Sequence, residues 1–502
     1  MQKEWGIVDI VEGNKDLRQK ATTGVVWTAV QKYSVTFITF VSDLILARLL
    51  LPEDFGCVEM LAIFMLLSGT IVNGGFGSAL IQKKRPTQED YSTIFFWNMG
   101  MAVSIYAILF FCAPSIARFY KTPLLSSVLR VQALVLLTNA FNIVQSNQLV
   151  KQFRFKTIAI VSVITNIVAL SITILMAYNG FGVWSLVAKN LIASSLTSLI
   201  FWYYLKWRPS FVFSVQSFKE LFSFGFYIFL SNLVTKFSSK LQGLLIGRIY
   251  SPSIVGYYAK ASGTEGVVST TISQILDNIT YPLYAEAQDD LQRLGNIVKR
   301  LVMALAYVTF PIIFIMVLIA KPMFVLLYSE KWLPSVPFFQ VLCIGGLADC
   351  LQSVNFYTIS AIGKSKITFV WTIVKRSVGI AGIFLGMALY GIKGILIGVV
   401  FNSWFSFLVN IGLVSKYIGY KWYCQLKDLF PVLSVSVICA VVSYGCSHLV
   451  SWSMYPDGIL KIIVFVALYV GWTFAFKPEA FLNFRDILRP IAQKMKFRRD
   501  IN

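Results

Sequence analysis

Long apolar segments, each separated from the next by a short polar stretch, recur along nearly the whole chain of 502 residues. A helix needs about 20 apolar residues to cross the hydrocarbon layer of a membrane, and most of these segments reach that length. We therefore expect an all-α integral membrane protein. The pattern predicts about fourteen membrane-spanning helices, at residues 21–49, 55–81, 91–113, 124–145, 158–178, 183–205, 222–250, 254–283, 301–320, 336–362, 367–389, 392–413, 429–450 and 459–476.

The composition agrees with this pattern. Hydrophobic residues make up 57% of the chain and charged residues 13%, too little polar surface to cover a soluble globule. The mean hydropathy is +0.70. The seven cysteines are an odd number and form no CxxC motif, so we expect neither a disulfide framework nor a metal site. The first 20 residues are polar, which argues against a cleavable signal peptide.

Basic residues gather in alternate connections between the predicted spans. With the N-terminus placed in the cytoplasm, the inner segments carry about 28 Lys and Arg and the outer ones about eight, as the positive-inside rule requires. We expect both termini to be cytoplasmic. We therefore attribute the net charge of +21 to basic residues that lie near anionic membrane lipids, rather than to nucleic-acid binding.

A short stretch at residues 44–56, LILARLLLPEDFG, has an echo at residues 244–256, LLIGRIYSPSIVG. Leu44, Arg48, Pro52 and Gly56 each meet the same residue 200 positions later. At an offset of 208, Pro114 and Tyr120 meet Pro322 and Tyr328, and the loop around Gly180 and Gly182 resembles that around Gly391 and Gly394. These matches indicate an internal repeat, although apolar sequences also resemble one another by composition.

The repeat predicts the domain organisation. Two parallel repeats related by an axis along the membrane normal are one of the architectures of secondary transporters, with a shared cleft between them. We expect a cytoplasmic segment (1–20), a first six-helix lobe (21–205), a cytoplasmic linker (206–221), a second six-helix lobe (222–413), two extra helices (429–476) and a basic cytoplasmic tail (477–502).

Three stretches of sequence resemble a known family: ARLLLPEDFG at the end of the first predicted helix, FGSALIQK, and YSEKWLPSVPFFQVL at residues 328–342. They are similar to the O-antigen and exopolysaccharide flippases of the multidrug/oligosaccharidyl-lipid/polysaccharide exporter superfamily. The resemblance implies a transporter of polysaccharide and lipopolysaccharide biosynthesis. It would move undecaprenyl-pyrophosphate-linked oligosaccharide from the inner to the outer leaflet of a bacterial cytoplasmic membrane by alternating access. It also implies membrane lipids, and a glycan polymerase or other export components, as partners.

Cations within the predicted spans are candidate binding residues, because a charge in a membrane is costly unless it faces a cavity or a partner. Lys236 and Lys240 are four positions apart and share a helix face. Two unpaired ammoniums there would repel each other, which favours a wet cavity that receives a pyrophosphate. Snorkelling and ion pairs with neighbouring helices are the alternatives. The candidate substrate-binding residues are Lys32, Lys236, Lys240, Lys260, Lys375 and Arg376.

Two further groups of charged residues suggest accessory roles. Arg48 and Arg248 lie at equivalent outer ends of spans, where they would either gate the cleft or cap the helix C-terminus at the lipid headgroups. Asp43, Glu265 and Asp277 lie within spans and are candidates for coupling transport to an H+ or Na+ gradient. Glu265 could instead neutralise Lys260, and Asp349 could pair with a lysine of the span at 367–389. The span at 254–283 is rich in hydroxyls and amides, which suits a wall that binds sugar or close interhelical packing.

Motifs for catalysis or nucleotide binding are missing from the sequence. It contains no HExxH, GxSxG or P-loop, so no catalytic residues are expected and ATP-driven pumping is disfavoured. A membrane enzyme of glycan polymerisation would need a long outer loop, which the predicted connections lack. A multidrug, cation-coupled antiporter is the other alternative, and an acid-rich cavity would favour it, whereas the lysines favour an anionic cargo.

Overall fold

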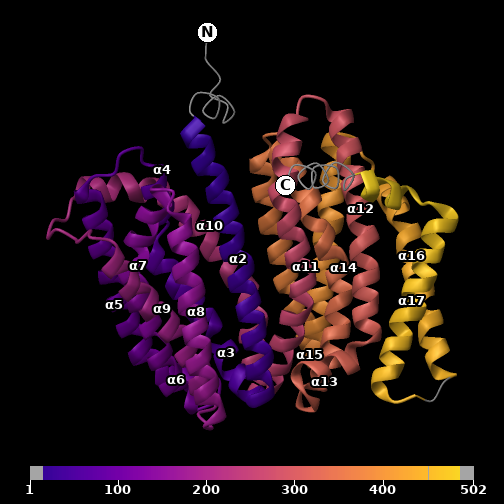
Figure 1. Cartoon of the computed structure of the whole chain (residues 1–502), viewed down its shortest axis with the longest axis horizontal. Coiled ribbons are helices and arrows are strands. Elements are labelled where there is room, and N and C mark those ends of the chain that lie inside the picture. The colour runs from indigo at the N-terminus through magenta and orange to yellow at the C-terminus, as the bar shows by residue number, and fades with distance from the viewer. Residues whose placement is uncertain (1–14, 450–451, 487–502) are drawn as a thin grey trace, which may run out of the picture. The chain divides into compact units, whose positions relative to one another are not determined.

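The computed structural model describes residues 15–449 and 452–486, and the regular structure in these ranges is helical throughout (Figure 1). The chain divides into two compact units, Met1–Gly256 and Tyr257–Asn502. The helices of unit 1 are α2 (Lys15–Leu49), α3 (Pro52–Asn73), α4 (Phe76–Gln82), α5 (Gln88–Phe119), α6 (Leu124–Gln132), α7 (Leu134–Lys151), α8 (Phe155–Tyr178), α9 (Val183–Tyr204) and α10 (Val215–Ile249).

Unit 2 is also helical in its described part. Helix α11 (Pro252–Glu286) begins in unit 1 and continues into unit 2. The remaining elements are α12 (Leu291–Leu318), α13 (Ala320–Tyr328), the short 3-10 helix η1 (Glu330–Trp332), α14 (Ser335–Ala361), α15 (Ser365–Ile418), α16 (Trp422–His448) and α17 (Met454–Phe476).

The prediction of an all-α membrane protein is confirmed, and the described residues of the predicted spans are helical except at short breaks and a few ends. Within the described residues, ten helices are long and apolar enough to cross a membrane. Helix α15 counts once among these ten, although Gly391 interrupts it between the two predicted spans with a non-helical φ of 59° and ψ of −132°. Helices α2, α10 and α11 each have 35 residues but are not among the ten. The number fourteen stays a prediction.

The predicted span 55–81 is divided between α3 and α4, as 124–145 is between α6 and α7. Gly74 and Gly75 have φ values of 53° and 76°, a conformation that only glycine adopts at little cost, and they separate α3 from α4. A Cβ atom added at Gly75 would overlap the carbonyl oxygen of Gly225 in α10. The break therefore lets the α10 backbone pack directly against the α3–α4 turn.

The predicted repeat is visible in the backbone at corresponding turns. Gly182, before α9, has φ 53° and ψ −129°, nearly the angles of Gly391. Phe153, after α7, has φ 55°, and Gly363, after α14, has φ 76°. In both turns the third residue after the helix donates its N–H to the carbonyl five residues back, Arg154 to Leu149 and Lys364 to Ile359. Such bonds satisfy carbonyls that a helix end would leave unpaired.

The two copies of the stretch that first revealed the repeat pack against each other within unit 1. A Cβ atom added at Gly56 would overlap the carbonyl oxygen of Pro252, and one added at Gly256 would overlap that of Pro52. The contact is reciprocal, because the glycine of each copy faces the proline of the other. Glycine is required at both positions because the two helix N-termini approach backbone to backbone.

The segment between α9 and α10 is bonded to the first turns of α5. Gln88 Nε2 donates to the Arg208 carbonyl at 2.8 Å, and the N–H groups of Ser210 and Ser214 donate to Ser92 Oγ and Thr93 Oγ1, each at 3.0 Å. Helix α10, which the sequence placed at the start of the second lobe, packs on α3, α4 and α5 inside unit 1. The predicted lobe boundaries stay a prediction.

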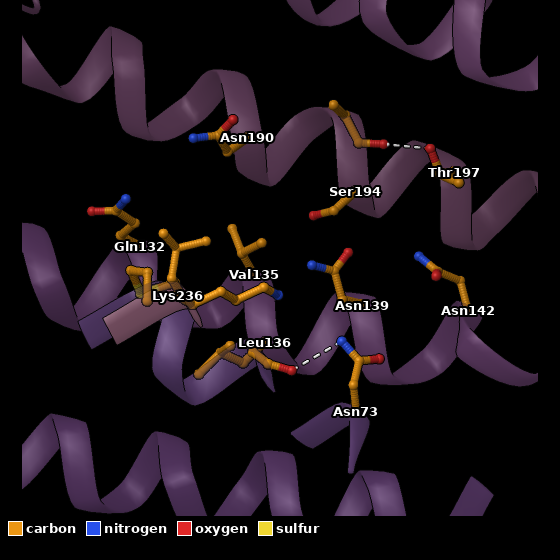
Figure 2. Close-up of a pocket in the computed structure, with 14 residues that line it drawn as sticks. Asn73, Gln132, Val135, Leu136, Asn139, Asn142, Asn190, Ser194, Thr197 and Lys236 are labelled. Atoms are coloured by element: carbon orange, nitrogen blue, oxygen red, sulfur yellow. Dashed lines mark hydrogen bonds between the residues drawn. The ribbon is translucent and has the colours of Figure 1, made fainter. Parts of the chain in front are cut away.

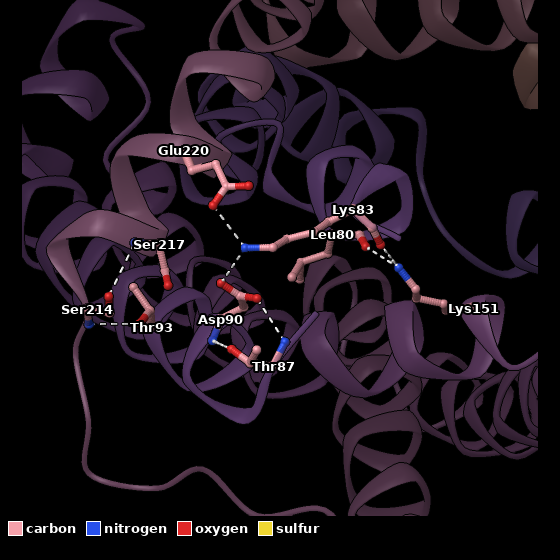
Figure 3. Close-up of polar contacts among 9 residues, drawn as sticks. All are labelled: Leu80, Lys83, Thr87, Asp90, Thr93, Lys151, Ser214, Ser217 and Glu220. Carbon is pink, nitrogen blue, oxygen red and sulfur yellow. Dashed lines mark hydrogen bonds and ion pairs between the residues drawn. The ribbon is translucent and has the colours of Figure 1, made fainter. Parts of the chain in front are cut away.

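A charged network fixes this end of unit 1 (Figure 3). Lys83 Nζ lies 3.1 Å from Asp90 Oδ1 of α5 and 3.0 Å from Glu220 Oε2 of α10. Burial disfavours the ammonium, but the hydrogen bonds to Glu220 and Asp90 outweigh it and raise the pKa of Lys83 above its ordinary value. Lys151 donates to the carbonyl of Leu80 at 3.0 Å and to that of Lys83, so a cation caps the C-terminus of α4.

Candidate functional site

An open polar chamber of about 530 Å³ lies inside unit 1 (Figure 2). Helices α3, α7 and α9 form its walls, α6 contributes Gln132 and α10 contributes Lys236. The lining residues are Met65, Leu66, Gly69, Asn73, Gln132, Val135, Leu136, Asn139, Asn142, Asn190, Ala193, Ser194, Thr197 and Lys236.

Amides and hydroxyls reach the chamber because their spacing puts them on one face of each helix. Asn190, Ser194 and Thr197 are spaced by four and three along α9, and Asn139 and Asn142 are three apart on α7, which is the spacing of helix neighbours. The sequence analysis did not single out these residues. The recurrence of amides at helical spacing was the signal that could have found them.

Some of these groups are held in place and others are available. Asn142 Nδ2 donates to Ser198 Oγ at 3.0 Å, and the hydroxyls of Ser194 and Thr138 are 2.7 Å apart. In the described part of the chain the side chains of Asn139 and Asn190 have no hydrogen-bond partner, and Gln132 Oε1 is buried without one. The Asn139 and Asn190 side chains are exposed, so only the buried oxygen of Gln132 carries the cost of an unmade hydrogen bond. A ligand bearing hydroxyls would bond to all three amides.

Lys236 is the one cation among the chamber's lining residues. Its side chain is half-buried, and no carboxylate among the described residues pairs with it. None of the described lining residues is acidic. An ammonium is a point-charge partner for phosphate groups that needs no rigid geometry, so the chamber can bind an anionic group beside hydroxyl-rich chemistry.

Lys240, one turn after Lys236, has a different setting. Its Nζ lies 2.7 Å from Glu59 Oε1 of α3. The expectation that both ammoniums lack an acidic partner is therefore wrong for Lys240, because the acid of the neighbouring span faces it. The repulsion argument consequently applies to Lys236 alone.

The other predicted cations of unit 1 lie outside the chamber. Lys32 is exposed on α2, and Arg48 is exposed at the end of that helix. Arg248 donates to the Phe119 carbonyl at 2.8 Å, and its guanidinium lies 4.9 Å from the centre of the Phe119 ring. Arg248 thus satisfies a carbonyl at the end of α5, while a gating role for either arginine stays a prediction.

In unit 2 two of the predicted cations, Lys260 and Lys375, are buried, and Arg376 is half-buried. Lys375 Nζ donates to Asn410 Oδ1 at 2.7 Å, and both residues are less than a tenth exposed. Lys260 Nζ lies 4.8 Å from the Tyr328 ring centre and 5.0 Å from that of Trp332, distances that allow cation–π attraction. Arg376 is a charged neighbour of Asp349.

The acidic candidates are distributed over several helices. Asp349 accepts hydrogen bonds from Ser403 Oγ at 2.9 Å and Gln352 Nε2 at 2.5 Å. Glu265 Oε1 is buried with no hydrogen-bond partner in the described structure. Asp43 is half-buried on α2. The side chain of Asp277, like several other polar side chains of the predicted sugar-binding wall, lies outside the described part. No group of three metal-ligating residues occurs among the described residues.

Comparison with known proteins places this geometry in context. A family model described as "Polysaccharide biosynthesis protein" matches residues 45–337. The teichuronic acid biosynthesis protein TuaB of Bacillus subtilis is 24% identical over 441 residues, which cover 86% of this chain and 90% of that protein. The lipopolysaccharide biosynthesis protein WzxC of Escherichia coli is 21% identical, with 86% and 88% covered. The succinoglycan biosynthesis transport protein ExoT of Rhizobium meliloti is 24% identical, with 89% and 90% covered.

Solved structures show the same fold. The lipid II flippase MurJ in an inward closed conformation matches with a TM-score of 0.72 at 13% identity, covering 93% of this chain and 100% of that one. A multidrug resistance MATE family transporter in an inward-facing conformation matches with a TM-score of 0.60 at 15% identity, covering 79% and 98%. With the ten apolar helices, these matches show a multi-pass membrane protein with the same fold as these transporters. The family model and the relatives confirm the family resemblance drawn from the sequence.

Proposed function

Because the chain belongs to the polysaccharide biosynthesis protein family, we propose that it is a flippase for lipid-linked oligosaccharide. The cargo is a glycan on undecaprenyl pyrophosphate, moved from the inner to the outer leaflet of a bacterial cytoplasmic membrane by alternating access, with both chain termini cytoplasmic. Relatives named for teichuronic acid, lipopolysaccharide and succinoglycan biosynthesis support a glycan cargo, and the fold of a lipid II flippase supports a lipid-linked one.

One observation carries this proposal: Lys236 faces a chamber that is otherwise lined by amides, hydroxyls and apolar groups (Figure 2). Amide groups both donate and accept hydrogen bonds, as sugar hydroxyls require. An ammonium without an acidic partner attracts the diphosphate that joins the glycan to its lipid. We assign Lys236 to the anionic group and the amides of Asn139 and Asn190 to the sugar.

The alternatives fit this chamber less well. A multidrug antiporter for cationic compounds would use carboxylates, and none of the described residues that line the chamber is acidic. The fold likeness to a multidrug transporter is shared by the flippase. An enzyme of glycan polymerisation is not supported, since the relative with a named activity is a transport protein.

Coupling to an H+ or Na+ gradient through Asp43, Glu265 or Asp277 is part of the same proposal. The unpartnered Oε1 of Glu265 supports it, because a buried carboxylate oxygen without a donor is a ready acceptor for a proton or a cation. Export that persists after an ionophore collapses both gradients would remove this part and leave the flippase assignment intact.

The test uses glycan export in a bacterial strain that lacks its own flippase. We expect Lys236→Gln to lower export at least about tenfold, since a charge-assisted bond contributes roughly 1.5–3 kcal/mol, and Lys236→Arg to restore part of it. Lys219→Gln is the matched control, because Lys219 is an exposed lysine of the same helix outside the chamber. Wild-type export by Lys236→Gln at equal protein level would refute the assignment.

A further inference from the structure

A second pocket, of about 560 Å³, opens at the end of unit 1 that the charge pattern places in the cytoplasm. It is separate from the chamber, and no residue lines both. Its walls are the first turn of α5, the last turn of α7, the turn before α8, and the end of α9 with the segment that follows. The lining residues are Gln88, Tyr91, Gln148, Gln152, Arg154, Tyr204, Leu205, Lys206 and Trp207.

The walls of this pocket are held by hydrogen bonds. Gln88 uses both ends of its amide, accepting from Trp207 Nε1 at 2.6 Å and donating to the Arg208 carbonyl at 2.8 Å. The rings of Tyr91 and Trp207 meet edge to face with their centres 6.2 Å apart. These contacts shape the pocket and leave its remaining polar groups to a ligand.

The available polar groups favour an anion. Arg154 and Lys206 are the lining cations, no lining residue is acidic, and neither cation forms an ion pair within the described structure. Gln148 is 5% exposed, yet its amide has no hydrogen-bond partner among the described residues. A guanidinium, an ammonium and a buried amide donor around one space match the oxygens of a phosphate group.

The surroundings indicate that this phosphate belongs to a membrane lipid. On α9, Leu199 and Tyr203 lie one turn apart just before the pocket and are 67% and 91% exposed. Exposed apolar and aromatic side chains at the end of a spanning helix contact acyl chains near the headgroups. A lipid tail along this face of α9 would bring its phosphate to the mouth of the pocket.

We propose that this pocket, built around Arg154, Lys206 and Gln148, binds the phosphate group of a membrane lipid. Basic pockets between spanning helices on the cytoplasmic side are suited to lipid headgroups. The ligand is either a resident anionic phospholipid or a polyprenyl diphosphate at the inner leaflet. Both sources supply the same chemistry, and the site does not depend on the proposed function of the chamber.

The experiment measures thermal stabilisation of the purified full-length protein in neutral detergent as ligand is added. The probes are dioctanoyl phosphatidylglycerol, geranylgeranyl diphosphate, dioctanoyl phosphatidylcholine and inorganic pyrophosphate. We expect the first or the second to stabilise the protein more than phosphatidylcholine does, and which of them is stronger identifies the source. Stabilisation by inorganic pyrophosphate equal to that by both lipids would overturn the lipid assignment.

Variants of the pocket test whether the stabilising lipid binds there. The double variant Arg154→Gln/Lys206→Gln is expected to raise the apparent dissociation constant about tenfold or more, since two charge-assisted contacts are lost. The control Lys156→Gln/Lys219→Gln removes the same charge from exposed residues outside the pocket and should leave binding unchanged. An equal loss in the control would show general surface attraction and refute the site.

Gln148→Leu provides a second, uncharged test. It removes a buried amide that has no partner within the protein, so the ligand-free melting temperature should hold or rise. We expect lipid binding to weaken several-fold, because the donor toward the phosphate is lost. Unchanged lipid affinity together with retained folding would contradict the assigned role of Gln148.

Discussion

Lys236 in unit 1 and Lys375 in unit 2 are both lysines within long helices, but the two units treat them differently. Lys236 is half-buried and opens to a chamber without an acid. Lys375 is buried, and its ammonium donates to Asn410. The turns around them follow the same backbone plan, as Gly182 and Gly391 show. The two units therefore share the backbone of these turns and differ in their internal charges, which we propose bind a ligand in unit 1 and hold helical segments together in unit 2.

Substitutions at the reciprocal glycine contact in unit 1 are expected to cause the largest loss of stability. Gly56→Ala or Gly256→Ala puts a methyl group onto the facing proline carbonyl, and overpacking of this kind costs about 3 kcal/mol. We expect a lower melting temperature and a smaller yield of folded protein in detergent.

Gly100→Ala is the control for this change. Nothing lies within 4 Å of the added methyl group at Gly100, so the substitution should stabilise α5 by roughly 0.5–1 kcal/mol. If Gly56→Ala and Gly100→Ala melt alike, the close approach of the two helices is wrong.

Lys375→Met tests the cohesive role of the charge in unit 2. The substitution leaves Asn410 Oδ1 buried without its donor, which costs about 2 kcal/mol. The double variant Lys375→Met/Asn410→Leu should recover most of that loss, since both polar partners are replaced together. Unfolding in a denaturant series measures both. A stable single variant that has lost export would move Lys375 into the group of binding residues with Lys236.

A pair of tyrosines related by the repeat provides a finer comparison. Tyr120 donates directly to the buried Met60 carbonyl at 2.9 Å. Tyr328 lies 3.0 Å from Thr264 Oγ1, which in turn donates to the Lys260 carbonyl at 2.8 Å, and Lys260 is the position 200 residues after Met60. Tyr120→Phe should cost about 1 kcal/mol by thermal unfolding. Tyr328→Phe should cost less, because Thr264 keeps its bond; the reverse order would refute this equivalence.

The smallest expected changes in stability come from substitutions in the turns after α7 and α14. Phe153 has a left-handed φ of 55°, where the other unit has Gly363. A side chain costs roughly 1–2 kcal/mol in this conformation, partly offset by the greater freedom of glycine in the unfolded chain. We expect Phe153→Gly to stabilise by about 0.5 kcal/mol and Gly363→Ala to destabilise by about 1 kcal/mol. Melting temperatures that move together would show that the turns are not equivalent.

Much of the fold could be predicted from the sequence, because hydrophobic length dictates spanning helices. The break of the span 55–81 could not, since Gly74 and Gly75 are tolerated within apolar helices and are needed here only because α10 crosses them. The placement of α10 in unit 1 also could not be predicted from the sequence. It depends on bonds between side chains distant in sequence, such as that between Lys83 and Glu220.

The candidate site was only partly accessible to sequence reasoning. The cost of a charge in a membrane pointed to Lys236, but the same argument pointed equally to Lys240 and Lys375. Their partners are Glu59 on α3 and Asn410, which lies beyond the Gly391 break of α15. The neutral amides of the chamber do not carry the cost of a charge in a membrane, so this argument did not identify them. The presence or absence of a partner in the described part of the folded chain, rather than residue type, distinguishes Lys236, for which we propose ligand binding, from Lys240 and Lys375.

The bonds between α5 and the segment after α9 bear on how such proteins can be recombined. The predicted linker between the two lobes, residues 206–221, lies inside a compact unit and is held there by bonds to Gln88, Ser92 and Thr93. A chimera that exchanges halves with a relative at this linker would separate those donors and acceptors. A crossover placed after α10 would retain these bonds. The segment to exchange between two flippases is therefore the predicted first lobe together with α10.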